Sequence, residues 1–168
     1  MTFNKEVCNA FFNFDSTLNK GHGIVSSIYS IINRKRNSNE IYFQSLETRI
    51  EREAISCKTV KQFLDLLSVC WANLPDEKSK WYVVAYLFFV TDKVDKLCQN
   101  TLPLDEYNQF KSNATILLYH ELDLRFENEL DETAWDIFNI SENLFAIPVP
   151  VFDILLGCAA IYSLYHVL

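Results

Sequence analysis

The sequence contains few of the residues that turn-rich β proteins need. Glycine occurs three times and proline four times in 168 residues, and the Asn-Gly and Asp-Gly pairs typical of tight hairpins are missing. Long regular elements are therefore favoured over a sandwich or barrel. Together with the helical spacing of the apolar residues, this scarcity predicts an all-α protein.

An excess of positive charge is also missing. The formal net charge is −7 at pH 7, whereas nucleic-acid binding draws much of its affinity from neutralising phosphates. We therefore expect no nucleic-acid partner. The basic residues between Arg34 and Lys61 and the acidic residues between Glu121 and Glu142 are interpreted as solvated helix faces.

Metal-binding and secretory signals are lacking too. The five cysteines form no C-x-x-C pair and no metal-ligand spacing, so we expect neither a metal site nor a cofactor. The N-terminal stretch MTFNKEVCNAFF lacks the long apolar core of a secretory signal. With an odd number of cysteines, this predicts reduced thiols and a cytoplasmic location.

The sequence also lacks the signatures of an active site. It indicates no Ser/His/Asp or Cys/His arrangement, and Gly21-His22-Gly23 lacks the further Gly and the Lys of a phosphate loop. Glu127 and Asp131 are four residues apart, which a solvated helix face explains better than acid–base catalysis. We predict that the protein is not an enzyme. The alternative, a small enzyme on an unrelated helical fold, requires a deep polar pocket.

Apolar residues recur at helical spacing in several parts of the chain, and 49% of all residues are apolar, which is enough for one domain with one core. The segment Thr59-Val-Lys-Gln62 is typical of a capping box ahead of a helix. The predicted apolar stripes are Ile24, Val25, Ile28, Ile31 and Ile32; Phe43, Leu46, Ile50 and Ala54; Val60, Phe63, Leu64, Leu67, Trp71 and Leu74; and Ala114, Leu118, Leu122, Phe126 and Leu130. A shorter helix is expected around residues 134–138.

The most apolar stretch of the first 147 residues lies in mid-chain, in KWYVVAYLFFV at residues 80–90. It is too short to span a bilayer, which takes about 20 residues, and it lacks the polar positions of a surface helix. Burying a large apolar side chain contributes about 1.5–3 kcal/mol, so such a helix is most stable where every side is covered. We expect a globular helical bundle in which amphipathic helices surround a buried central helical hairpin.

Three segments resemble motifs of the Bcl-2 family of apoptosis regulators. Gly23-Ile24-Val25 to Tyr29-Ser30-Ile31 is similar to the family's first helix. Lys80-Trp81 and the run after it resemble the motif in which a Trp opens the central fifth helix. Asp131-Glu-Thr-Ala-Trp135-Asp136-Ile137-Phe138 is similar to the second homology motif, where Trp-Asp-x-Phe follows a long amphipathic helix.

The chain departs from the family pattern at several positions. Lys80-Trp81-Tyr82-Val83 stands where family members usually read Asn-Trp-Gly-Arg, and Thr133-Ala134 stands where a Gly-Gly is usual. The missing Arg is the residue that pairs with an Asp of the bound helix. Lys78 or Lys80 could supply a cation instead, although a Lys does not replace the Arg fork. Such divergence is typical of rapidly evolving members, such as viral ones.

The resemblance implies a binding module that inhibits apoptosis by holding an amphipathic pro-apoptotic helix in a hydrophobic surface groove. Besides Lys78 and Lys80, the groove residues that it implies are Phe63, Leu67, Trp71, Trp81, Val84 and Phe88. We expect two or three of these six residues to be exposed to a ligand. Val84 is the one most expected to be purely core. The alternative is a Bcl-2-like adaptor with a closed groove that blocks innate immune signalling. A homodimer is compatible with either function.

The C-terminal stretch VPVFDILLGCAAIYSLYHVL carries no formal charge after Asp153. Residues 154–168 would extend only about 22 Å as a helix, against a hydrocarbon core of about 30 Å. We therefore expect this segment either to pack into the groove or core or to anchor in the mitochondrial outer membrane, and we favour neither alternative. We divide the chain into a helical domain at residues 1–147 and an apolar C-terminal helix at residues 148–168.

Overall fold

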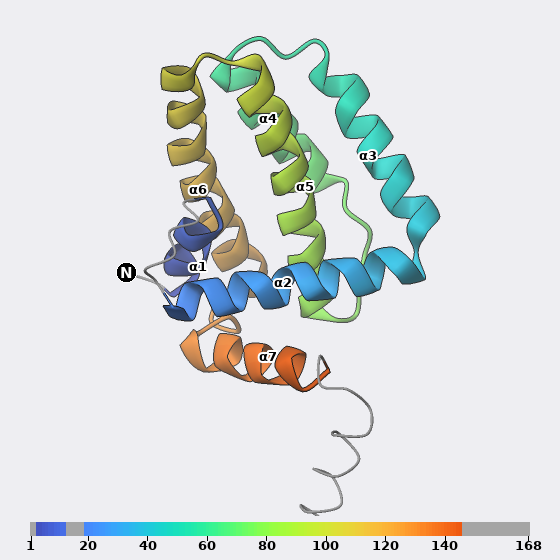
Figure 1. Cartoon of the computed structure of the whole chain (residues 1–168), viewed down its shortest axis with the longest axis vertical. Coiled ribbons are helices and arrows are strands. Elements are labelled where there is room, and N and C mark those ends of the chain that lie inside the picture. The colour runs from blue at the N-terminus through green and yellow to red at the C-terminus, as the bar shows by residue number, and fades with distance from the viewer. Residues whose placement is uncertain (1–2, 13–18, 146–168) are drawn as a thin grey trace, which may run out of the picture.

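The computed structural model describes residues 3–12 and 19–145, in which helices are joined by short connections and no strand is present (Figure 1). The all-α prediction is confirmed for this part of the chain. The helices are α1 (Phe3–Phe12), α2 (Asn19–Ser38), α3 (Glu40–Ala54), α4 (Val60–Ala72), α5 (Lys80–Thr101), α6 (Leu104–Phe126) and α7 (Glu132–Phe145).

Helix α5 lies at the centre of the molecule, where α2, α3, α4 and α6 all pack against it (Figure 1). Every residue from Val84 to Thr91 is buried, which is more than two full turns at about 3.6 residues per turn. The mid-chain apolar run therefore forms an enclosed helix, as its composition predicts. No face of these turns is left for solvent.

The second arm of the expected hairpin is enclosed on one side only. On α6, Ile116 and Leu124 are exposed, and charged residues such as Glu121 share the outer surface. The expectation of a hidden hairpin is therefore corrected, because α6 is amphipathic: α1, α4 and α5 pack against it but leave its outer face exposed. Its buried face consists of Tyr107, Phe110, Ala114, Thr115, Leu118, Leu122 and Phe126.

The predicted cap, the stripes on α2 and α3 and the stripe from Ala114 to Leu130 are confirmed at the side-chain level. In the α4 stripe, Val60, Leu64 and Leu74 are only partly buried. Every residue of the stripes on α2 and α3 is buried, and both helices use these stripes to pack against α5. The Thr59 side chain accepts the backbone N–H of Gln62 at 3.2 Å, and the Gln62 side chain accepts the backbone N–H of Thr59 at 3.1 Å. This reciprocal pair fixes the start of α4.

Helix α1 was not predicted. It adds one helix before the first predicted one. Asn4, Val7, Cys8 and Phe12 are buried at spacings of three and four residues, against α2 and α6. Burial raises the pKa of the Cys8 thiol well above its ordinary value, and the nearby Asp123 charge adds to this. The segment that resembles the family's first helix lies in α2, which is the second helix described.

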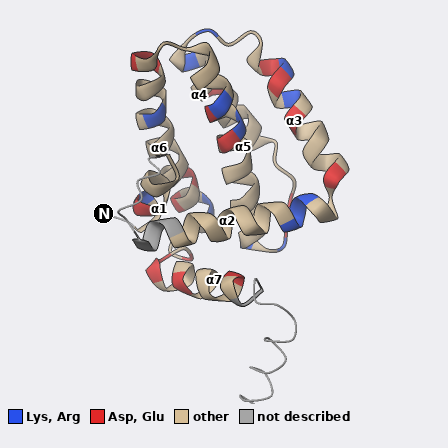
Figure 2. Ribbon diagram, viewed as in Figure 1, with Lys and Arg blue, Asp and Glu red and all other residues tan. Residues whose placement is uncertain are grey.

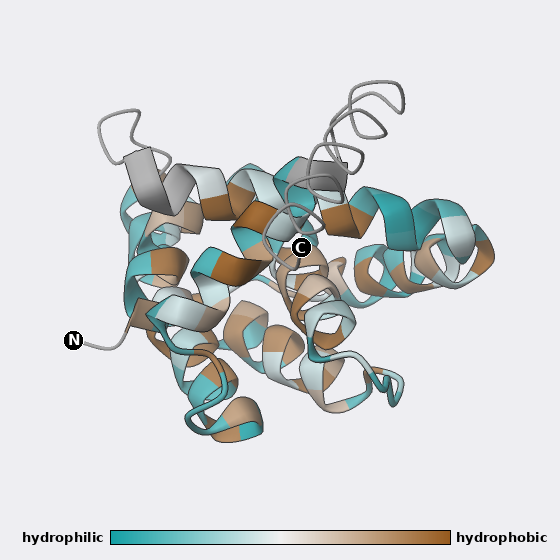
Figure 3. Ribbon diagram, turned by 90° about the horizontal axis from the view of Figure 1, so that it is seen from below, coloured by the Kyte–Doolittle hydropathy of each residue, from teal (hydrophilic) through white to brown (hydrophobic). Residues whose placement is uncertain are grey.

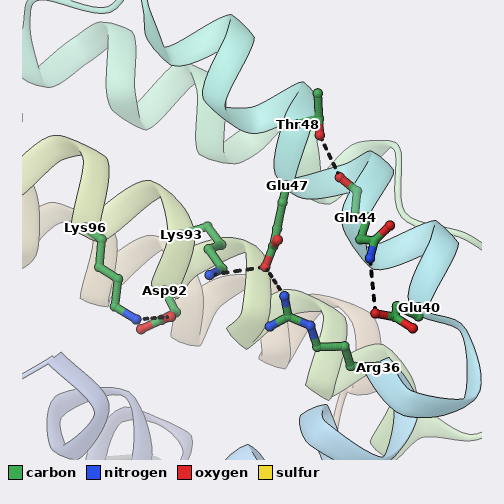
Figure 4. Close-up of polar contacts among 8 residues, drawn as sticks. All are labelled: Arg36, Glu40, Gln44, Glu47, Thr48, Asp92, Lys93 and Lys96. Carbon is green, nitrogen blue, oxygen red and sulfur yellow. Dashed lines mark hydrogen bonds and ion pairs between the residues drawn. The ribbon is translucent and has the colours of Figure 1, made fainter.

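A partly exposed polar network joins three of the helices around the core. Glu47 on α3 accepts Arg36 of α2 at 2.8 Å and lies 3.2 Å from the Lys93 ammonium of α5 (Figure 4). Exposed ion pairs contribute only about 0–1 kcal/mol each. This network therefore orients α2 and α3 on α5, while the buried stripes supply most of the stability.

None of the described helices is both long enough and apolar enough to cross a membrane. The C-terminal segment at residues 148–168, for which core packing and a tail anchor were both expected, lies outside the described residues.

The Thr59 cap generates a stability prediction. We expect Thr59→Ala to lower the free energy of unfolding by about 1 kcal/mol, because the N–H of Gln62 loses its side-chain acceptor. Urea unfolding followed by circular dichroism measures this change. Thr48→Ala is the matched control, since Thr48 is exposed within α3 and its hydroxyl bonds only to the Gln44 carbonyl. Equal losses in both variants would contradict the role of the cap.

Candidate interaction surface

The structure places most of the predicted groove residues in the core. Phe63, Leu67, Val84 and Phe88 have no exposed surface, and Trp71 is 3% exposed. Of the six apolar residues, only Trp81 is partly exposed, whereas two or three were expected to be. The physical reason is that α4 lies directly against α5 and α6. In this conformation the five buried side chains belong to the core, although Trp71 also borders a cavity of about 220 Å³ between α4 and α6.

Specific contacts hold this closed arrangement together. The Trp71 indole N–H donates to the carbonyl of Leu87 at 3.4 Å, and the Arg125 guanidinium donates to the Trp71 carbonyl at 2.8 Å. The Phe88 ring meets the Phe11 ring edge-on, with centroids 5.0 Å apart. Contacts with α5, α6 and α1 therefore all favour the closed state.

The two lysines proposed to replace the missing Arg lie at the start of α5. Lys80 donates to the carbonyl of Glu129 at 3.2 Å, and its ammonium lies 5.4 Å from the centroid of the Trp81 ring. Lys80 therefore ties the beginning of α5 to the α6–α7 connection. Lys78 is exposed in the connection between α4 and α5.

The two Trp-led segments, which are far apart in the sequence, meet in space. The Trp81 ring stacks on Phe138 with centroids 4.3 Å apart and planes 19° apart, and it meets Trp135 edge-on at 5.2 Å. The start of α5 is thus joined to α7 by aromatic contacts. Offset and edge-to-face pairs of this kind add about 0.5–1.5 kcal/mol beyond the area that they bury.

A buried hydrogen-bond chain positions Trp135 within this cluster. Its indole N–H donates to the Asn4 side-chain oxygen at 2.7 Å, and the Asn4 amide donates to Asp123 at 2.6 Å. Asn4 therefore links α1, α6 and α7. Sequence reasoning missed this residue, although its place one turn ahead of Val7 and Cys8 on an apolar stripe is the signal that could have found it.

A cavity of about 430 Å³ lies beside the aromatic cluster, between α2, α7 and the start of α5. Its apolar wall continues onto the outside of α7, where Ile137 and Ile140 are each 60% exposed. Figure 3 shows the molecule from below, the side on which α7 lies in Figure 1, with apolar positions in brown. The cavity is lined by Ile31, Arg34, Ser79, Trp81, Tyr82, Ile137, Phe138, Ser141 and Glu142.

An ion pair between an exposed arginine and a buried glutamate lies in the polar part of this cavity wall. Arg34 contacts Glu142 at 2.7 Å, and Glu142 is only 6% exposed. The second carboxylate oxygen of Glu142 is buried without a hydrogen-bond partner, which is costly for a polar atom. Ser27 donates to Asn139 at 2.6 Å and so holds α7 against α2 nearby.

A second ion pair lies on the other side of the α5 start. Lys35 pairs with Glu77 at 2.8 Å, and Glu77 accepts the Tyr86 hydroxyl at 3.2 Å. Burial raises the pKa of Tyr86, and the charge of Glu77 adds to the shift. The Lys35 ammonium also lies 4.5 Å from the centroid of the Tyr82 ring, which lines the cavity.

These features suit contact with another protein better than bond-making chemistry. The wall combines aromatic and aliphatic side chains with one charged pair, which is the usual composition of an interaction surface. Among the residues that the structure describes, no group of three or more His, Cys, Asp or Glu side chains could hold a metal ion. We define the α7 surface as Trp81, Tyr82, Ile137, Phe138 and Ile140.

Comparisons of the sequence with protein families and curated proteins, and of the fold with solved structures, returned no match. The resemblance to the Bcl-2 family therefore rests on the residues of the two Trp-led segments and of α2.

The burial of Phe88 generates a prediction that separates core from surface. We expect Phe88→Glu to unfold the protein, because an unpaired carboxylate in the core costs several kcal/mol and a domain has only about 5–15 kcal/mol of stability. Ile137→Glu, on the exposed α7 surface, should change stability by no more than about 0.5 kcal/mol. Thermal unfolding followed by circular dichroism measures both. A folded Phe88→Glu protein would show that this side chain reaches solvent.

The Asn4–Trp135 hydrogen bond generates a second stability prediction. We expect Trp135→Phe to cost about 1–3 kcal/mol, because the buried oxygen of Asn4 loses its donor. Trp81→Phe is the matched control, because it removes the same atoms from a half-buried ring that keeps its stack on Phe138. Denaturant unfolding of the two variants measures the difference. A larger loss for Trp81→Phe would contradict the importance of the hydrogen bond.

Proposed function

We propose that the protein is a Bcl-2-like, non-enzymatic regulator that acts by binding other proteins. The observation that carries the proposal is the aromatic contact between Trp81 and Phe138, because it brings together the two segments that resemble Bcl-2 motifs. The enclosure of α5 behind Trp81 also supports it. The open apolar face of α7 supports action through contact with a partner.

Two modes of action are compatible with this proposal. In the first, the protein inhibits apoptosis by holding a pro-apoptotic helix in the groove implied by the family resemblance. In the second, the groove stays closed and the protein blocks innate immune signalling as an adaptor. The burial of five of the six apolar groove residues favours the second mode.

The free energy of opening the groove gives the physical reason. Moving α4 away from α5 would expose Phe63, Leu67 and Trp71, which are all buried. At about 1.5–3 kcal/mol for each side chain, this costs a large part of the 5–15 kcal/mol that stabilises a typical domain. Contact at the α7 surface requires no such opening. We therefore propose the closed-groove adaptor as the function, with the α7 surface as its contact area.

A cell-based reporter of innate immune signalling tests the adaptor function. The wild-type protein should lower an innate immune reporter, and Ile137→Glu/Ile140→Glu should lose this effect because charges replace the apolar contact. Leu104→Glu/Leu124→Glu is the matched control, since both residues are exposed apolar side chains outside the α7 surface. Circular dichroism checks that each variant is folded.

Two measurements test the first mode, in which the protein holds a pro-apoptotic helix. They are calorimetry with peptides of such helices and caspase activity after a death stimulus. Binding at tens of micromolar and reduced caspase activity would favour the helix-holding inhibitor over the adaptor. A folded protein that changes neither the reporter nor caspase activity, and that binds no peptide, would refute the proposed function.

A further inference from the structure

A separate cavity of about 400 Å³ lies between α1 and α6, and it shares no residue with the α7 surface. Its lining contains two lysines and several neutral donors but no carboxylate. This is unusual in a chain with a net charge of −7. The lining residues are Lys5, Asn9, Asn108, Lys111, Ser112, Thr115 and Ile116.

The cavity is built by one face of each helix. Lys5 and Asn9 are four residues apart on α1. On α6, Ser112 follows Asn108 by four residues, and Thr115 follows Ser112 by three. Such spacing puts side chains on the same side of a helix. Because α1 and α6 pack against each other (Figure 1), the two polar faces meet at one place.

The two lysines differ from the other half-buried cations of the described chain. Lys35, Arg36, Arg49 and Lys93 each lie within 3.2 Å of a carboxylate oxygen, and Lys80 donates to a backbone carbonyl. Among the described residues, Lys5 and Lys111 are the half-buried cations that have neither kind of partner.

Each of the two ammonium groups lies near an aromatic ring of α6 that is outside the cavity lining. Lys5 lies 5.8 Å from the centroid of the Tyr119 ring, and Lys111 lies 5.3 Å from that of Tyr107. The hydroxyl of Tyr107 donates to Asp95 at 3.0 Å, so this carboxylate already has a partner and is outside the cavity lining. Burial raises the pKa of Asp95, and the bond from Tyr107 and the charge of Lys111 act against this shift. Within the described residues neither Lys5 nor Lys111 is held in an ion pair, so both side chains can turn toward a ligand in the cavity.

We propose that this cavity binds a phosphate monoester group. Two ammonium groups match its charge of about −1.5 to −2 at pH 7, and the side chains of Asn9, Asn108 and Ser112 can donate hydrogen bonds to its oxygens. The volume falls within the range of about 300–1,000 Å³ that is usual for small-ligand sites. The phosphate group belongs either to a soluble metabolite or to the headgroup of an anionic lipid.

Two binding measurements distinguish these sources. Calorimetry with glycerol 3-phosphate, a soluble phosphate monoester, tests the soluble ligand. Co-sedimentation with phosphatidylcholine vesicles that contain phosphatidylinositol 4-phosphate tests the lipid. Vesicles of phosphatidylcholine alone serve as the baseline. Binding in either arm should weaken with added salt, because the attraction is between charges.

The decisive comparison uses two variants with the same change in net charge. Lys5→Gln/Lys111→Gln should weaken binding at least about tenfold, because two charge-assisted hydrogen bonds are lost. Arg52→Gln/Lys58→Gln removes two exposed cations outside the cavity and should bind like the wild type. Circular dichroism checks the folding of both. The proposal is overturned if the wild type binds neither probe or if the two variants lose binding equally.

Discussion

The enclosure of α5 is the constraint on which the rest of the structure depends. A helix that is apolar on every side from Val84 to Thr91 is stable in water only when neighbours cover it completely. Helices α2, α3, α4 and α6 supply most of this cover, and Phe11 of α1 adds a ring against Phe88. At about 1.5–3 kcal/mol for each large side chain, the covered turns of α5 supply much of the favourable free energy of folding. The burial of the apolar stripes on α2, α3, α4 and α6 therefore depends on the central helix that they cover.

The enclosure ends at the start of α5, and the candidate interaction surface begins there. Trp81, Tyr82 and Val83 are only half-buried, because the covering helices do not surround this first turn. Helix α7 takes their place by stacking Phe138 on Trp81, and it leaves its own outer apolar residues uncovered. The α7 surface is thus an extension of the core. It forms where apolar residues lie outside the reach of the helices that cover the rest of α5. All charged side chains on α7 are acidic (Figure 2), and one of them, Glu142, pairs with Arg34 of α2.

The sequence predicts the elements of this fold better than it predicts their exposed faces. The run at residues 80–90, the stripes on α2 and α3, and the Thr59 cap are local patterns, so a single segment contains all the information that they need. Helix α1 is short, and its stripe includes the polar Asn4, which is buried only because Trp135 and Asp123 supply its partners. The groove prediction failed for a similar reason. The spacing of Phe63, Leu67 and Trp71 is the same whether α4 faces a ligand or packs on α5, and only tertiary contacts distinguish the two.

The same dependence on tertiary contacts explains why α1 borders two cavities of opposite charge. On one side, Glu6 belongs to an acidic cavity of about 620 Å³ that also contains Asp123 and Glu127 of the α6 end. On the other side, Lys5 lines a cavity together with Lys111 from the first half of α6. These charges are far apart in the sequence, and the bulk charge of −7 conceals the local excess of cations. Because Asn4 bonds both to α6 and to α7, this buried amide helps the apolar stripe of α1 to fix the helix between the two cavities.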